Sequence, residues 1–295
     1  METALTISDS EAGLRLDKLL ALRFDGRYSR TYFQYLIDKQ LVLVNGVQCK
    51  KRLRVESGDE VEIEFALTPE IDLEPEPIPL DIIFEDEHFL AVNKPPGLVV
   101  HPAPGNWSGT FVNALLHHCQ TLPAHAEPTR PGIVHRLDKE TSGLLLAAKN
   151  QEAQVKLVEM FASRKICKEY LALCYNHPKE QTIELPIGRH PKQRKKMAVV
   201  TTGKEAVTAL SVIQVGEKLS FIRLLPKTGR THQIRVHLQA IGCPLLGDPL
   251  YGVVGQAPRQ MLHAEKLSFL HPTTREPIRL FAPIPEDMKK ILLDF

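Results

Sequence analysis

The chain has 295 residues, 43% of them apolar and 24% charged, which is typical of a folded protein long enough for two domains. No apolar run approaches the roughly 18 residues needed to span a bilayer, and the acidic, polar N-terminus is unlike a signal peptide. Five cysteines without a Cys-x-x-Cys pair argue against a disulfide framework or a thiolate zinc site. We therefore expect a cytoplasmic protein with free thiols and no membrane segment.

Residues 13–68 are predicted to form a small α+β unit. Helices are expected over 14–20 and from 29 to 37, and strands over 41–44, 47–49 and 61–65. Asn45-Gly46 is a strong signal for a tight hairpin turn. Between Arg15 and Arg54, ten Lys or Arg stand against three acids. This excess is either a solvated surface or, as its clustering favours, a footprint for nucleic-acid phosphates.

The order of these elements resembles the small RNA-binding module of ribosomal protein S-four. The likeness covers about fifty residues and begins with Arg15-Leu16-Asp17-Lys18-Leu19-Leu20. It implies a module that delivers RNA to another domain. The helix-borne residues that it places toward RNA are Arg15, Lys18, Ser29 and Arg30.

Residues 69–79 are predicted to be a linker. The stretch 69–90 has eight acids and neither Lys nor Arg, and four prolines fall within its first eleven residues. Repeated prolines remove backbone donors and favour extended chain, which makes a semi-stiff connector. A second domain is expected over 80–295.

The second domain is predicted to mix strands and helices. Strands are expected over 82–84, 89–92, 144–148, 168–173 and 261–269, and helices from Thr110, after Asn150 as N-cap, and over 286–293. His117 and His118 are adjacent on a helix and do not converge on one point, so we expect no metal site. The fold class is α+β, with a mixed, largely antiparallel sheet flanked by helices and loops.

A short polar segment, residues 135–143, places Asp138 between two cations, Arg136 and Lys139. A Pro-Gly turn precedes it and an apolar run follows, which indicates a loop at the mouth of a sheet. The carboxylate is either part of a surface salt bridge or an acid held ionised by an arginine that the fold supplies. Tyr170, on the 168–173 strand, is either an ordinary strand aromatic or a stacking platform for a base.

The segment 188–204 contains six cations and no acid. Its prolines and Gly203 favour a loop or hairpin over a helix. Because this charge repels itself without a polyanion, a loop that follows phosphates is favoured over a merely solvated one. The cations are Arg189, Lys192, Arg194, Lys195, Lys196 and Lys204.

The segment 224–238 predicts a helix that Thr228 or Thr231 can cap. Arg235 lies beside its apolar stripe and can point partly inward, where a buried acid would need it. Arg230 and His232 are expected in the first turn, where helix N–H groups attract anions.

Taken in order, these motifs resemble the large-ribosomal-subunit (Rlu-type) pseudouridine synthase family over residues 80–285. The motifs that carry the resemblance are His135-Arg136-Leu137-Asp138, Thr141-Ser142-Gly143, the Tyr170 strand and the stretch from Gly229 to His237. Asn93-Lys94-Pro95-Pro96-Gly97, His101-Pro102, Gly247-Asp248-Pro249-Leu250-Tyr251-Gly252 and Leu262-His263-Ala264 also match.

The resemblance implies that the protein isomerises uridine to pseudouridine in RNA, without a cofactor or metal. Asp138 is then the essential carboxylate, Arg235 its guanidinium partner and Tyr170 the residue that stacks on the base. Arg136 is the side chain that occupies the space left by the flipped nucleotide. Large-subunit ribosomal RNA is the expected substrate, with transfer RNA as the alternative, and a monomer is expected.

Two other functions stay open at this point. One is a catalytically silent RNA-binding or ribosome-assembly protein, against which the intact Asp138, Tyr170 and Arg235 argue. The other is a glycosidic-bond hydrolase, which requires a second acid near the first, and Glu140 is the nearest candidate.

Overall fold

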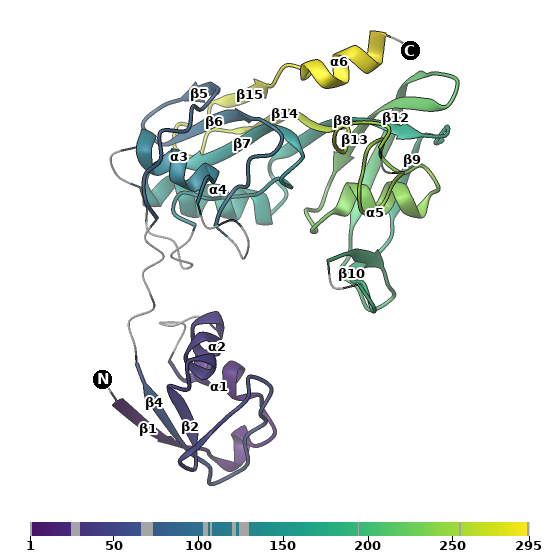
Figure 1. Cartoon of the computed structure of the whole chain (residues 1–295). Helices are drawn as coiled ribbons and strands as arrows, with labels where there is room; N and C mark the ends of the chain where they lie inside the picture. The colour runs from purple at the N-terminus through teal and green to yellow at the C-terminus, as the bar shows by residue number, and fades with distance from the viewer. Residues whose placement is uncertain are drawn as a thin grey trace. The chain divides into compact units, whose positions relative to one another are not determined.

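The computed structural model describes residues 2–24, 30–65, 73–102, 106, 108–119, 122–123, 130–193, 195–253, 255–293 and 295. They form two compact units, the first reaching to Leu73 and the second beginning at Glu74 (Figure 1). Both units combine helices with sheets that are mostly antiparallel, so the predicted α+β class is confirmed. Within the described residues, no helix has the length and apolar character needed to cross a membrane.

The first unit packs two helices on a four-stranded antiparallel sheet. Its elements are β1 (Glu2–Thr6), η1 (Asp9–Glu11), α1 (Leu16–Arg23), α2 (Arg30–Asp38), β2 (Val42–Val44), β3 (Val47–Gln48) and β4 (Glu60–Glu64), with strand order β1-β4-β2-β3. Leu16 and Leu20 of α1 and Phe33 of α2 are fully buried in its core. Asn45 and Gly46 both have positive φ, 52° and 72°, as the predicted hairpin turn requires.

Strand β1 lies outside the range predicted for this unit and was not expected. It pairs with β4 along its whole length, with Glu2 opposite Glu64 and Thr6 opposite Glu60. Pairing between the two ends of a unit is a long-range contact, so the sequence pattern of the first ten residues does not predict a strand there.

The second unit is built around a nine-stranded sheet, counted over the described residues. Its order is β5-β6-β7-β14-β8-β13-β12-β9, with β15 paired to β14. Among the described strands of this sheet, the one parallel pair is β7 with β14. The strands are β5 (Ile82–Glu85), β6 (Phe89–Lys94), β7 (Ser142–Ala148), β8 (Cys167–Tyr175), β9 (Gln181–Glu184), β12 (Val207–Val215), β13 (Leu219–Pro226), β14 (Leu262–Leu270) and β15 (Pro277–Phe281).

Strands β5, β6, β7, β8 and β14 lie where the sequence predicted strands, whereas β9, β12, β13 and β15 were not predicted. The basic segment 188–204 forms a two-stranded hairpin of β10 (Ile187–Arg189) and β11 (Met197–Val199), which confirms the prediction of a hairpin over a helix.

Helices cover both faces of this sheet. Four were predicted: α3 (Phe111–His118), α4 (Gln151–Ala162), α5 (Gln233–Ala240) and α6 (Glu286–Leu293). Along β8 the side chains alternate, so that Ala172 packs with Leu238 of α5 and Leu173 packs with Met288 of α6 on the other face. Helix α4, capped by Asn150 as expected, packs against β7. Figure 1 shows α6 on the opposite side of the sheet from α4 and α5.

The second half of the predicted linker is attached to the second unit. Asn113 of α3 donates to the Glu74 carbonyl at 2.9 Å, and the Glu76 amide donates to the Asn113 carbonyl at 3.0 Å. The Glu76 carboxylate also accepts the Gly109 amide at 2.8 Å. The unit therefore begins before the predicted boundary at Leu80.

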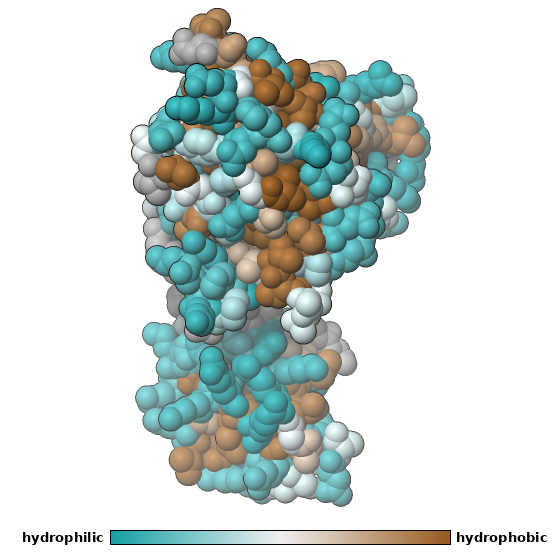
Figure 2. Space-filling view, turned by 90° about the vertical axis from the view of Figure 1, so that its right-hand side faces the viewer, coloured by the Kyte–Doolittle hydropathy of each residue, from teal (hydrophilic) through white to brown (hydrophobic). Residues whose placement is uncertain are grey.

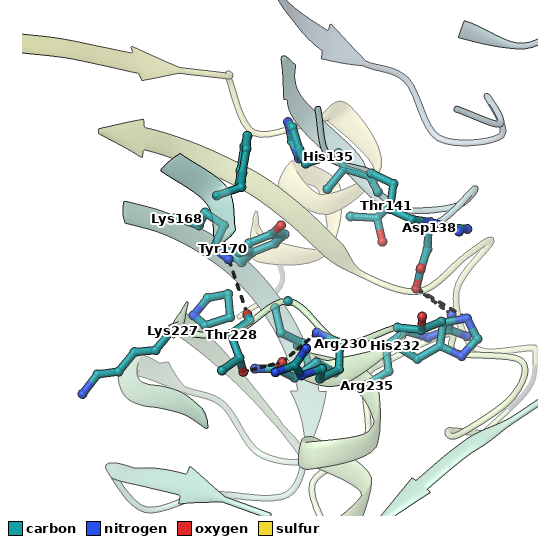
Figure 3. Close-up of a pocket in the computed structure, with 18 of the residues that line it drawn as sticks. His135, Asp138, Thr141, Lys168, Tyr170, Lys227, Thr228, Arg230, His232 and Arg235 are labelled. Carbon is teal, nitrogen blue, oxygen red and sulfur yellow. Dashed lines mark hydrogen bonds and ion pairs between the residues drawn. The ribbon is translucent and has the colours of Figure 1, made fainter. Parts of the chain in front are cut away.

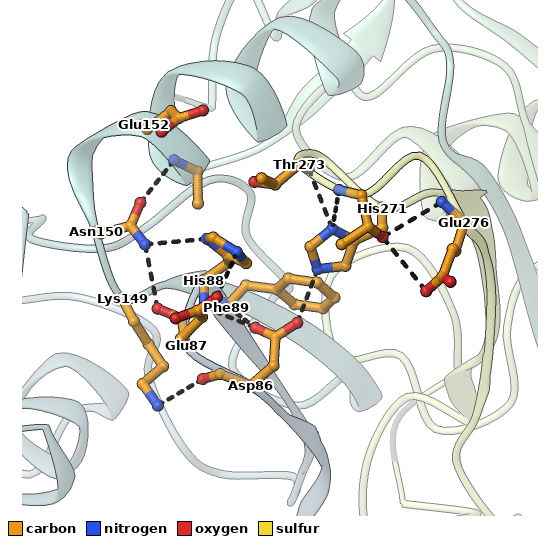
Figure 4. A network of polar contacts seen from close by, with 12 residues as sticks. Asp86, Glu87, His88, Phe89, Lys149, Asn150, Glu152, His271, Thr273 and Glu276 are labelled. Carbon is orange, nitrogen blue, oxygen red and sulfur yellow. Dashed lines mark hydrogen bonds and ion pairs between the residues drawn. The ribbon is translucent and has the colours of Figure 1, made fainter.

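A polar network joins the β5–β6 turn to the β14–β15 turn (Figure 4). Asp86 accepts the amides of His88 and Phe89 at 2.7 and 2.9 Å, and its other oxygen lies 2.7 Å from Nε2 of the buried His271. Nδ1 of His271 accepts the Thr273 and Thr274 amides, so Nε2 carries the proton that Asp86 accepts. The network fixes strand β6, which leads to Lys94 and the site described next.

Candidate active site

Asp138 lies in the loop that enters β7. The Thr141 amide donates to the Asp138 carbonyl at 3.0 Å, which folds the loop into a tight turn. Gly143 follows with φ of 106°, and a Cβ on it would lie 2.2 Å from the Ala264 carbonyl oxygen of β14. Only glycine fits that close approach, and it brings the loop to the end of the sheet. The prediction of a loop at the mouth of a sheet is confirmed.

Two buried cations hold the backbone beside Asp138. Lys94 is fully buried and donates to the carbonyls of Pro95, Leu98 and Lys139 at 2.8–3.0 Å. Burial lowers the pKa of Lys94 to about 7. Arg259 donates to the Glu140 carbonyl at 3.0 Å. The sequence analysis placed Lys94 only in a motif that matches the family, and this support was not predicted.

Arg235 reaches Asp138 from helix α5, ninety-seven positions along the chain, as predicted. Its Nη1 donates to Oδ2 of Asp138 at 2.9 Å. The bidentate grip, however, goes to Asp248, at 2.7 Å from Nε and 2.9 Å from Nη2. Arg235 is thus the guanidinium partner of Asp138, but it bridges two carboxylates and holds Asp138 through one hydrogen bond.

Asp248 was missed as a functional residue. It is fully buried, and besides Arg235 it accepts the amides of Leu250 and Tyr251 at 2.8 and 3.1 Å. Burial disfavours its charged form, but the Arg235 hydrogen bonds and charge outweigh burial and lower the pKa of Asp248. Asp138 and Asp248 in turn raise the pKa of Arg235 against its own burial. The sequence feature that could have pointed to Asp248 is its position as the single acid in a loop with a glycine at each end.

Tyr170, on β8, lines the same cavity as Asp138. Burial, and then the negative charge of Asp138, raise the pKa of the Tyr170 phenol. The Tyr170 hydroxyl therefore keeps its proton at neutral pH. The side chain offers an aromatic face and a hydroxyl donor to the cavity rather than a phenolate base.

His232 occupies a place that the sequence did not predict. It is the N-cap of α5 and has left-handed backbone, φ 56° and ψ 21°, and it makes no capping hydrogen bond. The expectation that Thr228 or Thr231 caps this helix is wrong, and Arg230 and His232 precede its first turn. Thr228 instead accepts the Val207 amide and donates to Gln233.

These side chains surround a cavity of about 440 Å³ (Figure 3). Among the described residues that line it, Asp138 is the single acid, and six are cations. Lys168 and Lys227 lie at one end, and Figure 3 shows the Asp138 carboxylate pointing to Arg235 at the other. The cations are Arg136, Arg164, Lys168, Lys227, Arg230 and Arg235. The cavity thus suits a polyanion and presents it with one carboxylate.

The residues predicted to bind RNA divide among three places. Arg136, Arg230 and His232 line the cavity. Arg189 ends β10, and Lys195 and Lys196 precede β11 on the basic hairpin, while Arg194 lies outside the described residues. Lys196 Nζ lies 5.9 Å from the ring centre of Tyr251, whose hydroxyl lies 2.9 Å from Nδ1 of His232 on the cavity wall.

The remaining predicted RNA-binding residues belong to the first unit. Asp17 is fully buried and bonds to Arg15 twice at 3.0 Å and to Arg30 at 2.9 Å. The Arg15 and Arg30 side chains keep 34% and 47% of their surface exposed. Lys18 lies on the exposed side of α1, and Ser29 lies outside the described residues. No group of three or more His, Cys, Asp or Glu placed to hold a metal occurs among the described residues.

Comparison with known proteins decides the family. Residues 88–240 match the model of the RNA pseudouridylate synthase family, over more than half of the chain. The chain belongs to this family. It is a pseudouridine synthase, an enzyme that isomerises uridine within RNA, and the resemblance inferred from its motifs is confirmed.

Two relatives align with this pseudouridine synthase over nearly their full length. The uncharacterized RNA pseudouridine synthase YlyB of Bacillus subtilis is 42% identical, over 98% of this chain and 96% of that protein. Ribosomal large subunit pseudouridine synthase D of Escherichia coli K12 is also 42% identical, over 99% and 94%. Among solved structures, human RNA pseudouridylate synthase domain containing 1 is 32% identical, with a TM-score of 0.57, over 70% of this chain and 83% of that one.

Proposed function

We propose that this synthase converts specific uridines of large-subunit ribosomal RNA to pseudouridine, with Asp138 as the essential carboxylate. The observation that carries the proposal is the lone acid on the wall of a cationic cavity, held by an arginine that is itself fixed to a buried aspartate. The substrate class follows the relative from Escherichia coli, whose name assigns it to the large ribosomal subunit.

The reaction breaks the bond between N1 of uracil and C1′ of ribose, turns the base, and joins C5 to C1′. The proton on C5 is lost and N1 gains one, so nothing else is consumed. Asp138 serves by attacking C1′, by attacking the base, or by removing the 2′ proton. Each route needs a carboxylate fixed next to the sugar, and the Arg235 bond provides that orientation.

The cavity receives a nucleotide that has left its stack. Base flipping costs a few kcal/mol, which contacts with the flipped base and its phosphates must offset. Tyr170 provides a face for the base, and Arg136, which is exposed at the rim beside Asp138, fills the space left behind. The basic hairpin and the first unit bind the surrounding RNA through phosphates, and the first unit delivers the substrate.

The enzyme acts in the cytoplasm as a monomer in this account. The exposed apolar side chains of the second unit are spread over several elements. Among them are Val155 and Val158 on α4, Ile213 and Val215 on β12, Leu270 on β14, Phe281 on β15 and Leu293 on α6. Figure 2 shows the apolar groups on the face in view gathered in several patches, with hydrophilic groups between and around them. Light scattering on the purified chain tests this, and a stable dimer at micromolar concentration would contradict it.

Pseudouridine mapping tests the substrate. Total RNA from cells with and without this chain is compared position by position, and purified large-subunit ribosomal RNA is treated with the enzyme. We expect at least one large-subunit uridine to be modified in both experiments. Modification of transfer RNA alone would overturn the substrate assignment while leaving the activity intact.

A further inference from the structure

His232 is held in an unusual conformation beside the reacting carboxylate. A non-glycine residue with φ of 56° is strained, and such strain persists only where the surrounding structure holds it. Ser, Thr, Asp or Asn would suit an N-cap better, yet His232 makes no capping bond. Its ring is turned instead toward Tyr251 and the cavity.

The hydrogen bonds of Tyr251 fix which ring nitrogen of His232 carries the proton. The Met197 amide, which can only donate, lies 2.8 Å from the Tyr251 hydroxyl oxygen, and Nδ1 of His232 lies 2.9 Å from it. The phenol proton is satisfied if it is donated to Nδ1. If Nδ1 of His232 carried hydrogen and donated it to Tyr251, the phenol proton of Tyr251 would need another acceptor. The described residues place no such acceptor within hydrogen-bond distance. Nε2 of His232 therefore carries hydrogen.

Nε2 faces the catalytic carboxylate without bonding to it. It lies 3.9 Å from Oδ2 of Asp138, the oxygen that Arg235 holds at 2.9 Å. That distance is too long for a hydrogen bond. Burial, the largest influence, lowers the pKa of His232 against the opposing charge of Asp138. A neutral ring offers a donor without forming an ion pair that would neutralise the carboxylate.

We propose that His232 is a further catalytic residue, which donates a hydrogen bond from Nε2 to a uracil carbonyl oxygen, and that Tyr251 positions it. When the bond between N1 and C1′ breaks, negative charge develops on the uracil oxygens. A donor already oriented at that point stabilises the charge without rearrangement. The proposal rests on Asp138 being the catalytic carboxylate.

Tyr251 connects this donor to the basic hairpin. Its ring meets His232 edge-on, with centroids 5.6 Å apart, and the Arg235 guanidinium lies 5.1 Å from its centre. Its hydroxyl accepts the first amide of β11. Correct seating of the hairpin thus sets the orientation of the His232 ring.

Two substitutions of His232 test the donor. Asparagine tolerates left-handed backbone and suits an N-cap, but its short amide does not reach the Nε2 position. Glutamine can place its amide N–H there. In single-turnover assays with saturating enzyme, we expect His232→Asn to lower the rate about 100-fold and His232→Gln to retain more than a tenth of it, with RNA affinity unchanged in both. Equal rates for the two variants, or a rate loss explained by weaker binding, would overturn the proposal.

Tyr251→Phe tests the positioning role, with Tyr175→Phe as its control. Phenylalanine keeps the ring against Arg235 and removes only the hydroxyl. The Tyr175 hydroxyl bonds to Gln256 at 2.6 Å and has no role in the cavity. We expect about a 10-fold lower rate for Tyr251→Phe and an unchanged rate for Tyr175→Phe. In ¹⁵N spectra of labelled histidine, the signals that disappear in His232→Asn should show a protonated Nε2 in the wild type and a mixture of tautomers in Tyr251→Phe. A protonated Nδ1 in the wild type would refute the assignment.

Asp138→Asn, assayed in parallel, distinguishes a failure of the His232 proposal from a failure of the proposed role of Asp138. If it abolishes turnover while His232→Asn does not change it, this inference alone fails. If Asp138→Asn retains turnover, the proposed mechanism fails first.

Discussion

Each unit buries an aspartate against arginine, and the two clusters are built in opposite ways. In the first unit a carboxylate is central: Asp17, fully buried, holds Arg15 and Arg30, whose side chains stay 34% and 47% exposed. A buried acid surrounded by partly exposed cations presents positive charge at the surface. This suits a partner that carries phosphates.

In the second unit a guanidinium is central. Arg235 is 5% exposed and is gripped on one side by the buried Asp248, which leaves Nη1 to hold Asp138, whose side chain is 21% exposed. The charge of the buried Arg235 is thus neutralised by Asp248, and Arg235 holds the Asp138 carboxylate toward the cavity. In the proposed function, the same pair of groups serves to bind a polyanion in the first unit and to offer a reactive acid in the second.

Of the two buried aspartates, Asp248 of the second unit is expected to give the larger effect when it is replaced. Asp248→Asn leaves the Arg235 charge with a single carboxylate partner, and removing one member of a buried ion pair costs about 3 to 5 kcal/mol of unfolding free energy. Because Arg235 is no longer fixed, Asp138 also shifts, and we expect the single-turnover rate to fall about 100-fold.

Chemical denaturation and the rate on a ribosomal RNA fragment measure both effects. Glu286→Gln is the matched control, since Glu286 is 77% exposed and pairs only at the surface with Lys289. It should change the unfolding free energy by less than about 0.5 kcal/mol. An Asp248→Asn protein as stable and as active as the wild type would show that Asp248 does not support Arg235.

A smaller effect is expected in the first cluster, and its sign is informative. Asp17→Asn makes the unit more positive by one charge, so affinity that depended on net charge alone would rise. If Asp17 orients Arg15 and Arg30 toward phosphates, RNA affinity falls instead, by about 10-fold. The slope of log affinity against log salt concentration then decreases by the equivalent of about one or two phosphate contacts.

Asp38→Asn provides the control for charge. Asp38 is 55% exposed, pairs with Lys51 and holds neither arginine. It should leave RNA affinity unchanged or slightly higher. Equal tightening by the two variants, with the unit folded by circular dichroism, would mean that Asp17 has no orienting role.

The smallest effect concerns pH. Burial opposes ionisation of Asp17, but hydrogen bonds from Arg30, Gln34 and Arg15 outweigh it and lower the pKa from 3.8 to about 2. A carboxyl whose pKa is lowered by folding adds stability above its unfolded pKa, and this stability is lost as pH falls through the folded value. The first unit should therefore lose stability between about pH 4 and pH 2.

The methyl NMR signals of Leu16 and Leu20, which are buried in this unit, report its thermal unfolding in the full chain. Asp17→Asn should remove part of the pH dependence in this window. Identical pH profiles for the two proteins would contradict the role assigned to the carboxylate.

Features governed by neighbouring residues were predictable from sequence. The Asn45-Gly46 turn, the Asn150 cap and the helix over 286–293 follow from local backbone preferences and periodicity, and all three are observed. The pairing of Asp138 with Arg235 was reached through the family resemblance, because no local pattern links residues so far apart.

Features set by long-range contacts were not predictable. Strand β1 is defined by β4, and Asp248 becomes important only because its loop returns to Arg235. The left-handed backbone of His232 opposes the local preference for a threonine cap, and Tyr251 and the cavity hold it in place. Local preferences were overruled at the site, where strain and burial serve the chemistry.

The most direct test of the central claim measures product formation by Asp138→Asn. An RNA with tritium at C5 of uracil releases it when C5 joins C1′, so single-turnover release counts the reaction. Asparagine keeps the shape of the side chain but lacks the reactive carboxylate, and we expect release to fall by at least about 10⁴-fold with RNA affinity preserved. Glu140→Gln, which removes the neighbouring acid, should stay within about threefold of the wild type because one carboxylate suffices for the reaction. Near-normal release by Asp138→Asn would contradict the account.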